Sequence, residues 1–392
     1  MAVQSGLLRA ARQRAGGEMP GVRTFRSARF RLVIGIVLCA AGWLVLGTVL
    51  LRQASNPAGQ WGFDFAAYHT AAAELLAGRS PYAAEMFGGP IPAQGAILYK
   101  YPPLLAQLFA PLAGLPLALA AVVWFAGQAL MILLGVWLAA RAGGAPRSAE
   151  TLVWSGVAAT FFLPCFDTLW KGNVSGALLL FVGLGLAGGA AGAAGATAAT
   201  LLKTTPAVLL VPAFARGRTT VRGLLAGLAV GGISLLLAPA AWWDFARVLP
   251  NLVSGPSLYA TNLAPHSLVS FAAPDLPLVA EAARVAAIGL ALGALGASVL
   301  LARRTGRWAA ALTLAVAASL LLPSATWYHY LAVLLPIAAY AWPRARTRAR
   351  LALLAGAGAI SLGVAWLPLA VGGSALVVVT ALAIVSTPGD RS

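Results

Sequence analysis

The sequence predicts an all-α polytopic membrane protein with about 12–13 transmembrane or partly spanning helices and a helical first outer loop. Three observations lead to this fold class. Hydrophobic residues make up 60% of the chain and charged residues only 9%, whereas about 25% of the residues of a soluble domain are charged. Apolar runs near the spanning length, about 17–25 residues, recur from Leu32 onward. Arginines gather in short segments between these runs.

The expected elements follow in order along the chain. Residues 32–51 form the first span, and residues 52–98 form an outer loop in which "AAYHTAAAELLAG" is typical of a helix. Gly78 and Pro81 end that helix. Further helices are expected over 101–115, 117–140, 151–169, 174–186, 188–202, 206–215, 224–241, 276–302, 308–322, 328–342, 351–369 and 371–386. Several between Val174 and Ala215 are too short to span, which is tolerable where they line a cavity enclosed by protein.

The arginine clusters predict the orientation and the domain organisation. They lie before the first span and at 216–222, 303–307 and 344–350, which is the positive-inside pattern of cytoplasmic loops. This distribution, rather than nucleic acid binding, accounts for the net charge of +17. We expect a basic cytoplasmic arm over residues 1–31, one membrane domain over 32–387 and a short tail over 388–392. The abundance of Ala, Gly, Pro and Arg indicates a bacterial genome and hence a bacterial plasma membrane.

The side of the membrane that segment 141–149 faces stays open at this point. Arg141 and Arg147 favour the cytoplasm. Counting two crossing helices after Tyr101 places the segment outside instead.

Lysine and histidine side chains lie at helix ends or between apolar runs. The chain contains three lysines, Lys100, Lys171 and Lys203, and three histidines, His69, His266 and His329. A lysine at a membrane interface is often explained by snorkelling of its ammonium to water. Because each of the three lysines adjoins Pro, Gly or an aromatic residue, we favour an anionic ligand such as a phosphate. Asp167 is expected to pair with Lys171.

Two interpretations of Asp64 in "DFAAYH" remain open. A lone carboxylate is suited to act as a general base on a hydroxyl group. An aspartate in front of an alanine-rich helix is equally suited to be its N-cap. On a helix, Tyr68 lies on the same face as Asp64, four residues on.

The stretch "SATWYHYL" places Trp327 and His329 at the start of a late helix. An interfacial aromatic belt explains these residues, and so does a cavity edge that stacks on sugar or contacts phosphate. The chain lacks nucleotide-binding and metal-ligand motifs, so we expect no cofactor and no metal. An enzyme of this kind needs a substrate that is already activated, and a lipid-phosphate sugar fits that description.

Five segments resemble glycosyltransferase family 87, a family of integral-membrane enzymes in the GT-C superfamily. They are "DFAAYHTAAAELLAGRSPY", "YKYPPLLAQLFAPLAGLP", "KGNVSGALLLFVGL", "LLKTTPAVLLVPAF" and "LPSATWYHYLAVLLP". The third departs from the family's Gly-Gln-x-Asn pattern, because Lys171-Gly172-Asn173 stands there.

The resemblance implies a GT-C-like bundle that transfers a sugar, mannose in the best-known members, from a polyprenyl-phosphate donor to a glycan or glycolipid of the cell envelope. It implies inversion at the sugar and a role for Asp64 as general base. Lys203 is then expected to hold the donor phosphate with help from Lys100 and His329. Tyr68, Lys171, Asn173 and Trp327 are expected at the substrate. The alternatives are a transporter or flippase and an enzyme of the same superfamily that moves another sugar, such as arabinofuranose.

Overall fold

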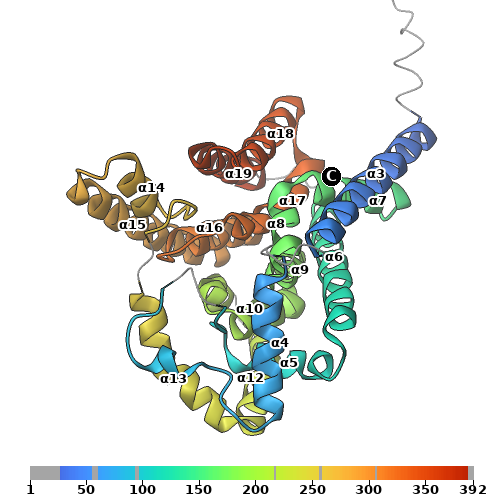
Figure 1. The fold of residues 1–392 in the computed structure, drawn as a ribbon. Helices are drawn as coiled ribbons and strands as arrows, with labels where there is room; N and C mark the ends of the chain where they lie inside the picture. The colour runs from blue at the N-terminus through green and yellow to red at the C-terminus, as the bar shows by residue number, and fades with distance from the viewer. Residues whose placement is uncertain are drawn as a thin grey trace, which may run out of the picture.

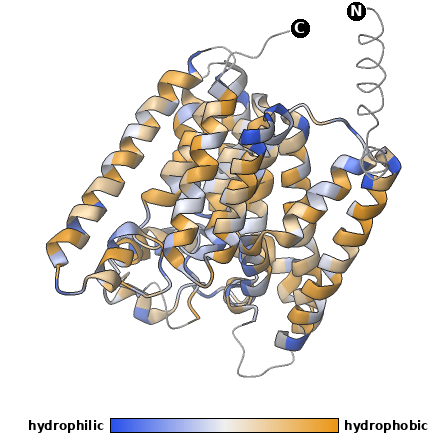
Figure 2. Ribbon diagram, turned by 90° about the horizontal axis from the view of Figure 1, so that it is seen from above, coloured by the Kyte–Doolittle hydropathy of each residue, from blue (hydrophilic) through white to orange (hydrophobic). Residues whose placement is uncertain are grey.

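The protein is built of helices, and its computed structural model describes residues 27–54, 61–92, 97–215, 218–255, 258–304 and 307–386 (Figure 1). No strand occurs in these residues, so the predicted all-α class is confirmed. Most of the basic arm and the tail lie outside the described residues, and the division into arm, membrane domain and tail stays a prediction. Hydrophobic residues run along the helices, and hydrophilic ones lie mainly at their ends (Figure 2).

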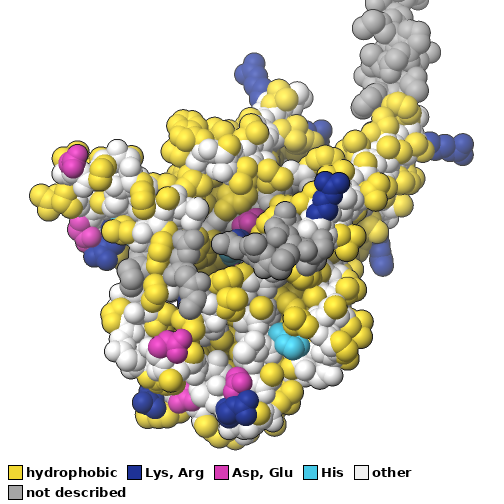
Figure 3. All heavy atoms as spheres, in the orientation of Figure 1, with side chains coloured by type: hydrophobic (Ala, Val, Ile, Leu, Met, Phe, Trp, Pro, Cys, Tyr) yellow, Lys and Arg dark blue, Asp and Glu magenta, His cyan; other side chains and the backbone are white. Residues whose placement is uncertain are grey.

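Among the described residues, 5 helices are long and apolar enough to cross a membrane. They are α3 (Ala28–Ala54), α6 (Leu117–Ala142), α12 (Arg218–Leu237), α15 (Pro277–Ala302) and α19 (Leu367–Ser386). The protein is therefore a multi-pass membrane protein. Hydrophobic side chains cover most of the surface shown in Figure 3, as a lipid-exposed surface requires.

Eight further helices of the described residues are shorter and include the partly spanning ones that the sequence predicts. They are α4 (Phe63–Leu76), α5 (Pro103–Ala113), α9 (Ser175–Ala187), α10 (Gly189–Leu202), α11 (Leu210–Phe214), α16 (Trp308–Leu321), α17 (Leu334–Ala341) and α18 (Thr347–Leu362). Four 3₁₀ helices accompany them: η1 (Ala84–Phe87), η2 (Thr205–Leu209), η3 (Tyr328–Val333) and η4 (Trp342–Arg344). The segments that connect α10 to η2 and α16 to η3 both line the cavity described below.

The helix expected over 151–169 is instead two helices, α7 (Ala149–Phe161) and α8 (Leu163–Lys171), bent by 72°. Phe162 has an extended backbone between them. Pro164 explains the break, because proline lacks the N–H that a continuing helix needs but fits the first turn of a new one. The bend turns the end of α8 towards the start of α4.

Two further helices, α13 (Pro239–Ser254) and α14 (Pro265–Ala272), were not expected from the sequence. The apolar run expected over 224–241 ends earlier, at Leu237, because Pro239 begins α13. Asp244, Arg247 and Asn251 interrupt the sequence of α13, so it lacks the continuous apolar run that predicts a span.

Segment 141–149 lies at the same end of the bundle as the start of α3, and the cytoplasmic orientation of that end stays a prediction. Arg31 Nε donates to Glu150 Oε1 at 2.7 Å, so the first turns of α3 and α7 are neighbours. The count of two crossings fails because α5 has 11 residues, about 16 Å of helix against a hydrocarbon core of about 30 Å. Only α6 crosses between the outer loop and this segment.

Two hydrophobic cores hold the helices together. One is formed largely by α6, α8, α9, α16, α17 and α19, and the other by α4, α5, α6 and the segment around Tyr99. Phe125 and Phe181 pack against both cores. The polar residues singled out by the sequence lie beside this junction.

Candidate functional site

A cavity of about 940 Å³ contains most of the polar residues that the sequence predicts as a site. Its walls come from the start of α4, the segment before α5, the end of α8, the α10–η2 connection, α13, α15 and the segment between α16 and η3. Charged side chains are visible in the central hollow of the surface in Figure 3. Seven of the eight predicted site residues line this cavity: Asp64, Lys100, Lys171, Asn173, Lys203, Trp327 and His329.

Asp64 is not the N-cap of its helix. Helix α4 begins after Gly62, whose left-handed backbone (φ 68°) occupies the cap position, and no side chain caps the helix. Asp64 therefore lies inside the first turn, where the helix dipole favours a negative charge. The capping interpretation is wrong because Gly62 takes that position, and the carboxylate is directed to another partner.

That partner is Asn173, which follows α8. Asn173 Nδ2 donates to Asp64 Oδ2 at 2.7 Å and lies 3.0 Å from the Tyr101 hydroxyl. Asn173 Oδ1 accepts from the backbone N–H and the hydroxyl of Ser175, so the amide orientation is fixed. Among the described residues, Asp64 Oδ1 makes no hydrogen bond. The carboxylate is thus held by one oxygen while the other can accept a proton.

Gly172 makes the contact between α8 and α4 possible. Its backbone is left-handed (φ 66°), and a Cβ there would lie 2.6 Å from the Phe65 Cβ. The Gly172 carbonyl accepts from Trp124 Nε1 at 2.8 Å, which fixes the turn from the other side. A residue with a side chain would push α8 away from α4 and separate Asn173 from Asp64.

We expect Gly172→Ala to lower both the thermal unfolding midpoint and sugar transfer, because it adds a steric overlap to backbone strain of about 1–3 kcal/mol. Gly78→Ala is the matched control: Gly78 has a similar φ of 72°, but its Cβ would meet open space. The comparison needs thermal unfolding and transfer rates for both variants. Equal losses in the two would show that the α4–α8 contact adds nothing beyond backbone strain.

Lys203 places a buried ammonium group at the cavity. Its residue is 6% exposed, and Nζ lies 3.4 Å from the centroid of the Tyr330 ring. The Nζ atom has no hydrogen-bond partner among the described residues. An ammonium buried in this way is costly unless an anion reaches it, and a cation–π contact compensates only in part. The arrangement is suited to a ligand that brings its own negative charge.

Lys100 and Lys171 add positive charge to the same cavity. Lys100 Nζ donates to the Pro92 carbonyl at 2.7 Å, and this hydrogen bond orients the lysine side chain. Burial lowers the pKa of the Lys100 ammonium, and the Asp64 carboxylate partly opposes that shift. Lys100 is therefore close enough to Asp64 for the two charges to interact.

His329 pairs with Asp167, which corrects the expected pairing of Asp167 with Lys171. Asp167 Oδ2 lies 3.2 Å from His329 Nδ1. The other ring nitrogen, Nε2, is buried and has no partner among the described residues. The carboxylate fixes the ring and favours a proton on Nδ1. Sequence proximity suggested Lys171, but the 72° bend before α8 directs Asp167 towards η3.

The segment that carries Trp327 is held by a residue that the sequence analysis missed, Asn262. Its Oδ1 accepts from the backbone N–H of Thr326 at 2.8 Å and of Ala264 at 2.9 Å. Its Nδ2 donates to the Ser324 carbonyl at 2.9 Å. Asn262 is polar and fully buried, but it stands in a loop between apolar runs, so the sequence alone did not distinguish it from a solvated loop residue.

Tyr68 lies beneath the cavity rather than on its wall. It is fully buried, packs edge-on against Tyr101 with ring centroids 5.0 Å apart, and its hydroxyl lies 3.4 Å from the Val174 N–H. In this structure Tyr68 packs against Tyr101, which lines the cavity, and its predicted place at the substrate stays a prediction. Of the other two histidines, His266 lines the cavity and His69 does not.

The charge of the cavity favours an anionic ligand. Four basic side chains and two carboxylates line it, namely Lys100, Lys171, Lys203 and Arg284 with Asp64 and Asp167. Asp167 already faces His329 and Asp64 already holds Asn173. Arg284 is itself paired with Glu281, so the three lysines supply the positive charge that suits a phosphate group in this cavity.

The fold and the cavity define a polytopic membrane protein with a basic, partly enclosed polar site. The sequence profile described as Glycosyltransferase family 87 matches residues 99–323, more than half of the 392 residues. The chain therefore belongs to glycosyltransferase family 87 and is a membrane glycosyltransferase. No curated protein matches the chain at a significant level. Asp64 and His329 lie outside the matched range, and the folded chain brings both to residues within it.

Proposed function

We propose that the protein transfers a sugar, with mannose as the predicted sugar, from a polyprenyl-phosphate donor to a hydroxyl group of a cell-envelope glycan or glycolipid. The observation that supports this most is the presence of Lys203 and Asp64 on one cavity. A buried ammonium without a hydrogen-bond partner suits the donor phosphate, and a carboxylate with one oxygen open suits the acceptor hydroxyl.

In the proposed step, Asp64 takes the proton of the acceptor hydroxyl while the acceptor oxygen forms a bond to the anomeric carbon. The bond between that carbon and the phosphate oxygen breaks, and its electron pair leaves with the polyprenyl phosphate. Lys203 neutralises the charge that develops on the phosphate, with Lys100 and His329 as further donors. Attack opposite to the leaving group inverts the anomeric configuration, so a β-linked donor gives an α-linked product.

Asn173 positions the base in this proposal. Its amide occupies Asp64 Oδ2 and leaves Oδ1 as the oxygen that would take the proton of the acceptor. Among the described residues Asp64 forms no ion pair, which agrees with that role.

The donor class is tested with purified protein and a panel of labelled donors. Polyprenyl-phosphate mannose, glucose and arabinofuranose are compared with the corresponding nucleotide sugars. We expect transfer from a polyprenyl phosphate and none from a nucleotide sugar. Transfer from polyprenyl-phosphate arabinofuranose alone would identify arabinofuranose as the transferred sugar. Transfer from nucleotide sugars would contradict the proposed donor class. The family membership favours a transferase over the transporter alternative.

We place the cavity on the outer side of a bacterial plasma membrane and the start of α3 in the cytoplasm, following the arginine distribution. In a background without Cys39 and Cys165, Arg79→Cys is expected to react with an impermeant thiol reagent added to intact cells. Arg79 is exposed in the outer loop. Arg303→Cys, exposed after α15, is the matched control that should react only after permeabilisation. The reverse pattern would place the cavity in the cytoplasm.

A further inference from the structure

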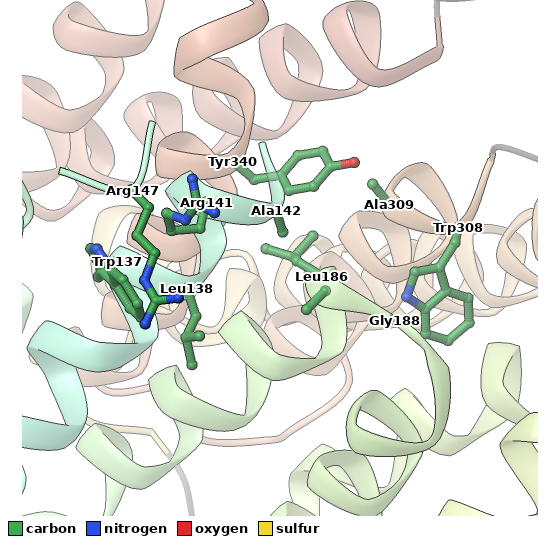
Figure 4. Close-up of a pocket in the computed structure, with 11 residues that line it drawn as sticks. Trp137, Leu138, Arg141, Ala142, Arg147, Leu186, Gly188, Trp308, Ala309 and Tyr340 are labelled. Carbon is green, nitrogen blue, oxygen red and sulfur yellow. The ribbon is translucent and has the colours of Figure 1, made fainter. Parts of the chain in front are cut away.

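A second cavity, of about 560 Å³, shares no lining residue with the Asp64–Lys203 cavity (Figure 4). It is bounded by the ends of α6, α9 and α17 and by the start of α16. We call this end of the bundle the arginine-rich face. Two contacts join neighbouring segments at this end: Arg344 Nη2 donates to the Ala142 carbonyl, and Arg31 pairs with Glu150.

The charge that lines this cavity is positive. Arg141 and Arg147 contribute guanidinium groups, and no acidic residue lines it. The nearest acid along the chain, Glu150, is already bound by both Nε and Nη2 of Arg31. Arg141 uses Nη1 to hold the Ala145 carbonyl at 2.6 Å, which fixes the loop. Arg147 makes no hydrogen bond or ion pair within the part of the chain that the structure describes.

The walls of the cavity combine aromatic and aliphatic side chains. Trp137 lies beside the two arginines in Figure 4, and Trp308 lies at the far end. Trp308 Nε1 donates to the Gly185 carbonyl at 2.6 Å, so its ring is a fixed wall. Leu138 and Leu186 complete the apolar part of the lining. Tryptophans of this kind lie at the level of lipid headgroups, where one side is apolar and the other polar.

We propose that this cavity binds the headgroup of an anionic membrane phospholipid, separately from the catalytic site. Guanidinium groups match phosphate oxygens in charge and geometry, and basic pockets between transmembrane helices bind anionic headgroups. The apolar walls suit the glycerol and the first carbons of the acyl chains. Topology alone explains arginines on this face, but not two of them on the wall of a cavity that also contains Trp137 and the fixed ring of Trp308.

The test uses purified protein in nanodiscs of phosphatidylcholine that contain a small fraction of labelled phosphatidylglycerol, with bound lipid measured by exchange. We expect Arg141→Gln/Arg147→Gln to weaken phosphatidylglycerol binding about 10–30-fold, since each arginine near the membrane surface contributes about a fivefold step and the two steps multiply. Arg303→Gln/Arg304→Gln is the control. It removes the same charge on the same face but from residues outside the cavity, and we expect it to change binding less than about threefold.

Three results would overturn the proposal: equal losses in the two double variants, no preference for phosphatidylglycerol over phosphatidylcholine in the wild type, or equally tight binding of soluble glycerol 3-phosphate. The last would identify a free anion rather than a lipid as the ligand. Arg147→Gln alone guards against misfolding, because this exposed side chain makes no bond that the fold needs. It should weaken binding while leaving the thermal unfolding midpoint unchanged.

Discussion

Asp64→Asn is expected to leave the protein folded and able to bind donor, yet to lower the rate of sugar transfer about 10²–10⁴-fold, the typical contribution of a general base. An asparagine oxygen can still accept from Asn173 Nδ2, so the local geometry survives. The start of α4 also survives, because Gly62 and not Asp64 occupies the cap position. Unlike the Asp64 carboxylate, the asparagine amide cannot take the proton of the acceptor hydroxyl.

The controls separate the loss of the base from the loss of a negative charge. Asp244→Asn removes a carboxylate on α13 that lies 3.9 Å from Arg247 and outside the cavity, and we expect it to transfer sugar at the wild-type rate. Asp64→Ala should be as inactive as Asp64→Asn and less stable, because Asn173 loses its partner. An Asp64→Asn protein that transfers sugar at the wild-type rate would remove Asp64 from the mechanism.

Lys203→Met should weaken donor binding about 10–100-fold, since a hydrogen bond to a charged group contributes about 1.5–3 kcal/mol. The same change should raise the thermal unfolding midpoint without donor, because it replaces a buried ammonium that lacks a hydrogen-bond partner with an apolar chain of similar length. These two effects have opposite signs. If Lys203 only snorkelled to the membrane interface, Lys203→Met would leave donor binding unchanged and would not raise the thermal unfolding midpoint.

Lys203→Arg is the matched variant, because it keeps the charge and changes the shape of the group. We expect its donor affinity to lie between those of the wild type and Lys203→Met. Donor binding and thermal unfolding are measured on the same preparations. If all three proteins bind donor equally, the phosphate is held elsewhere, and the remaining basic side chains of the cavity become the candidates.

The sequence predicted the class of the fold and most of the residues that meet at the cavity. Long apolar runs and arginine clusters are local signals, and they correctly indicated the spanning helices and the short ones after Val174. The rarity of lysine made Lys100, Lys171 and Lys203 conspicuous, and the structure places all three on one cavity. Because this signal depends on composition alone, it does not require knowledge of the helix packing.

The parts that the sequence did not predict depend on contacts between distant segments. Whether Asp64 caps α4 is decided by the left-handed Gly62 and by Asn173, 109 residues away. The pairing of Asp167 with His329 depends on the bend between α7 and α8. The side of segment 141–149 depends on the failure of α5 to cross. None of these can be derived from local periodicity, because each is set by which helix ends meet.

The proposed reaction breaks the bond between a sugar and a lipid phosphate at the Asp64–Lys203 cavity. It is tested most directly by following both halves of a doubly labelled polyprenyl-phosphate mannose with purified wild-type protein, an envelope glycolipid acceptor and Asp64→Asn in parallel. We predict that the wild type releases polyprenyl phosphate in step with the appearance of α-linked mannose on the acceptor, and that Asp64→Asn does neither. Donor that crosses a vesicle membrane with both labels still joined, in either protein, would contradict this account and favour a transporter.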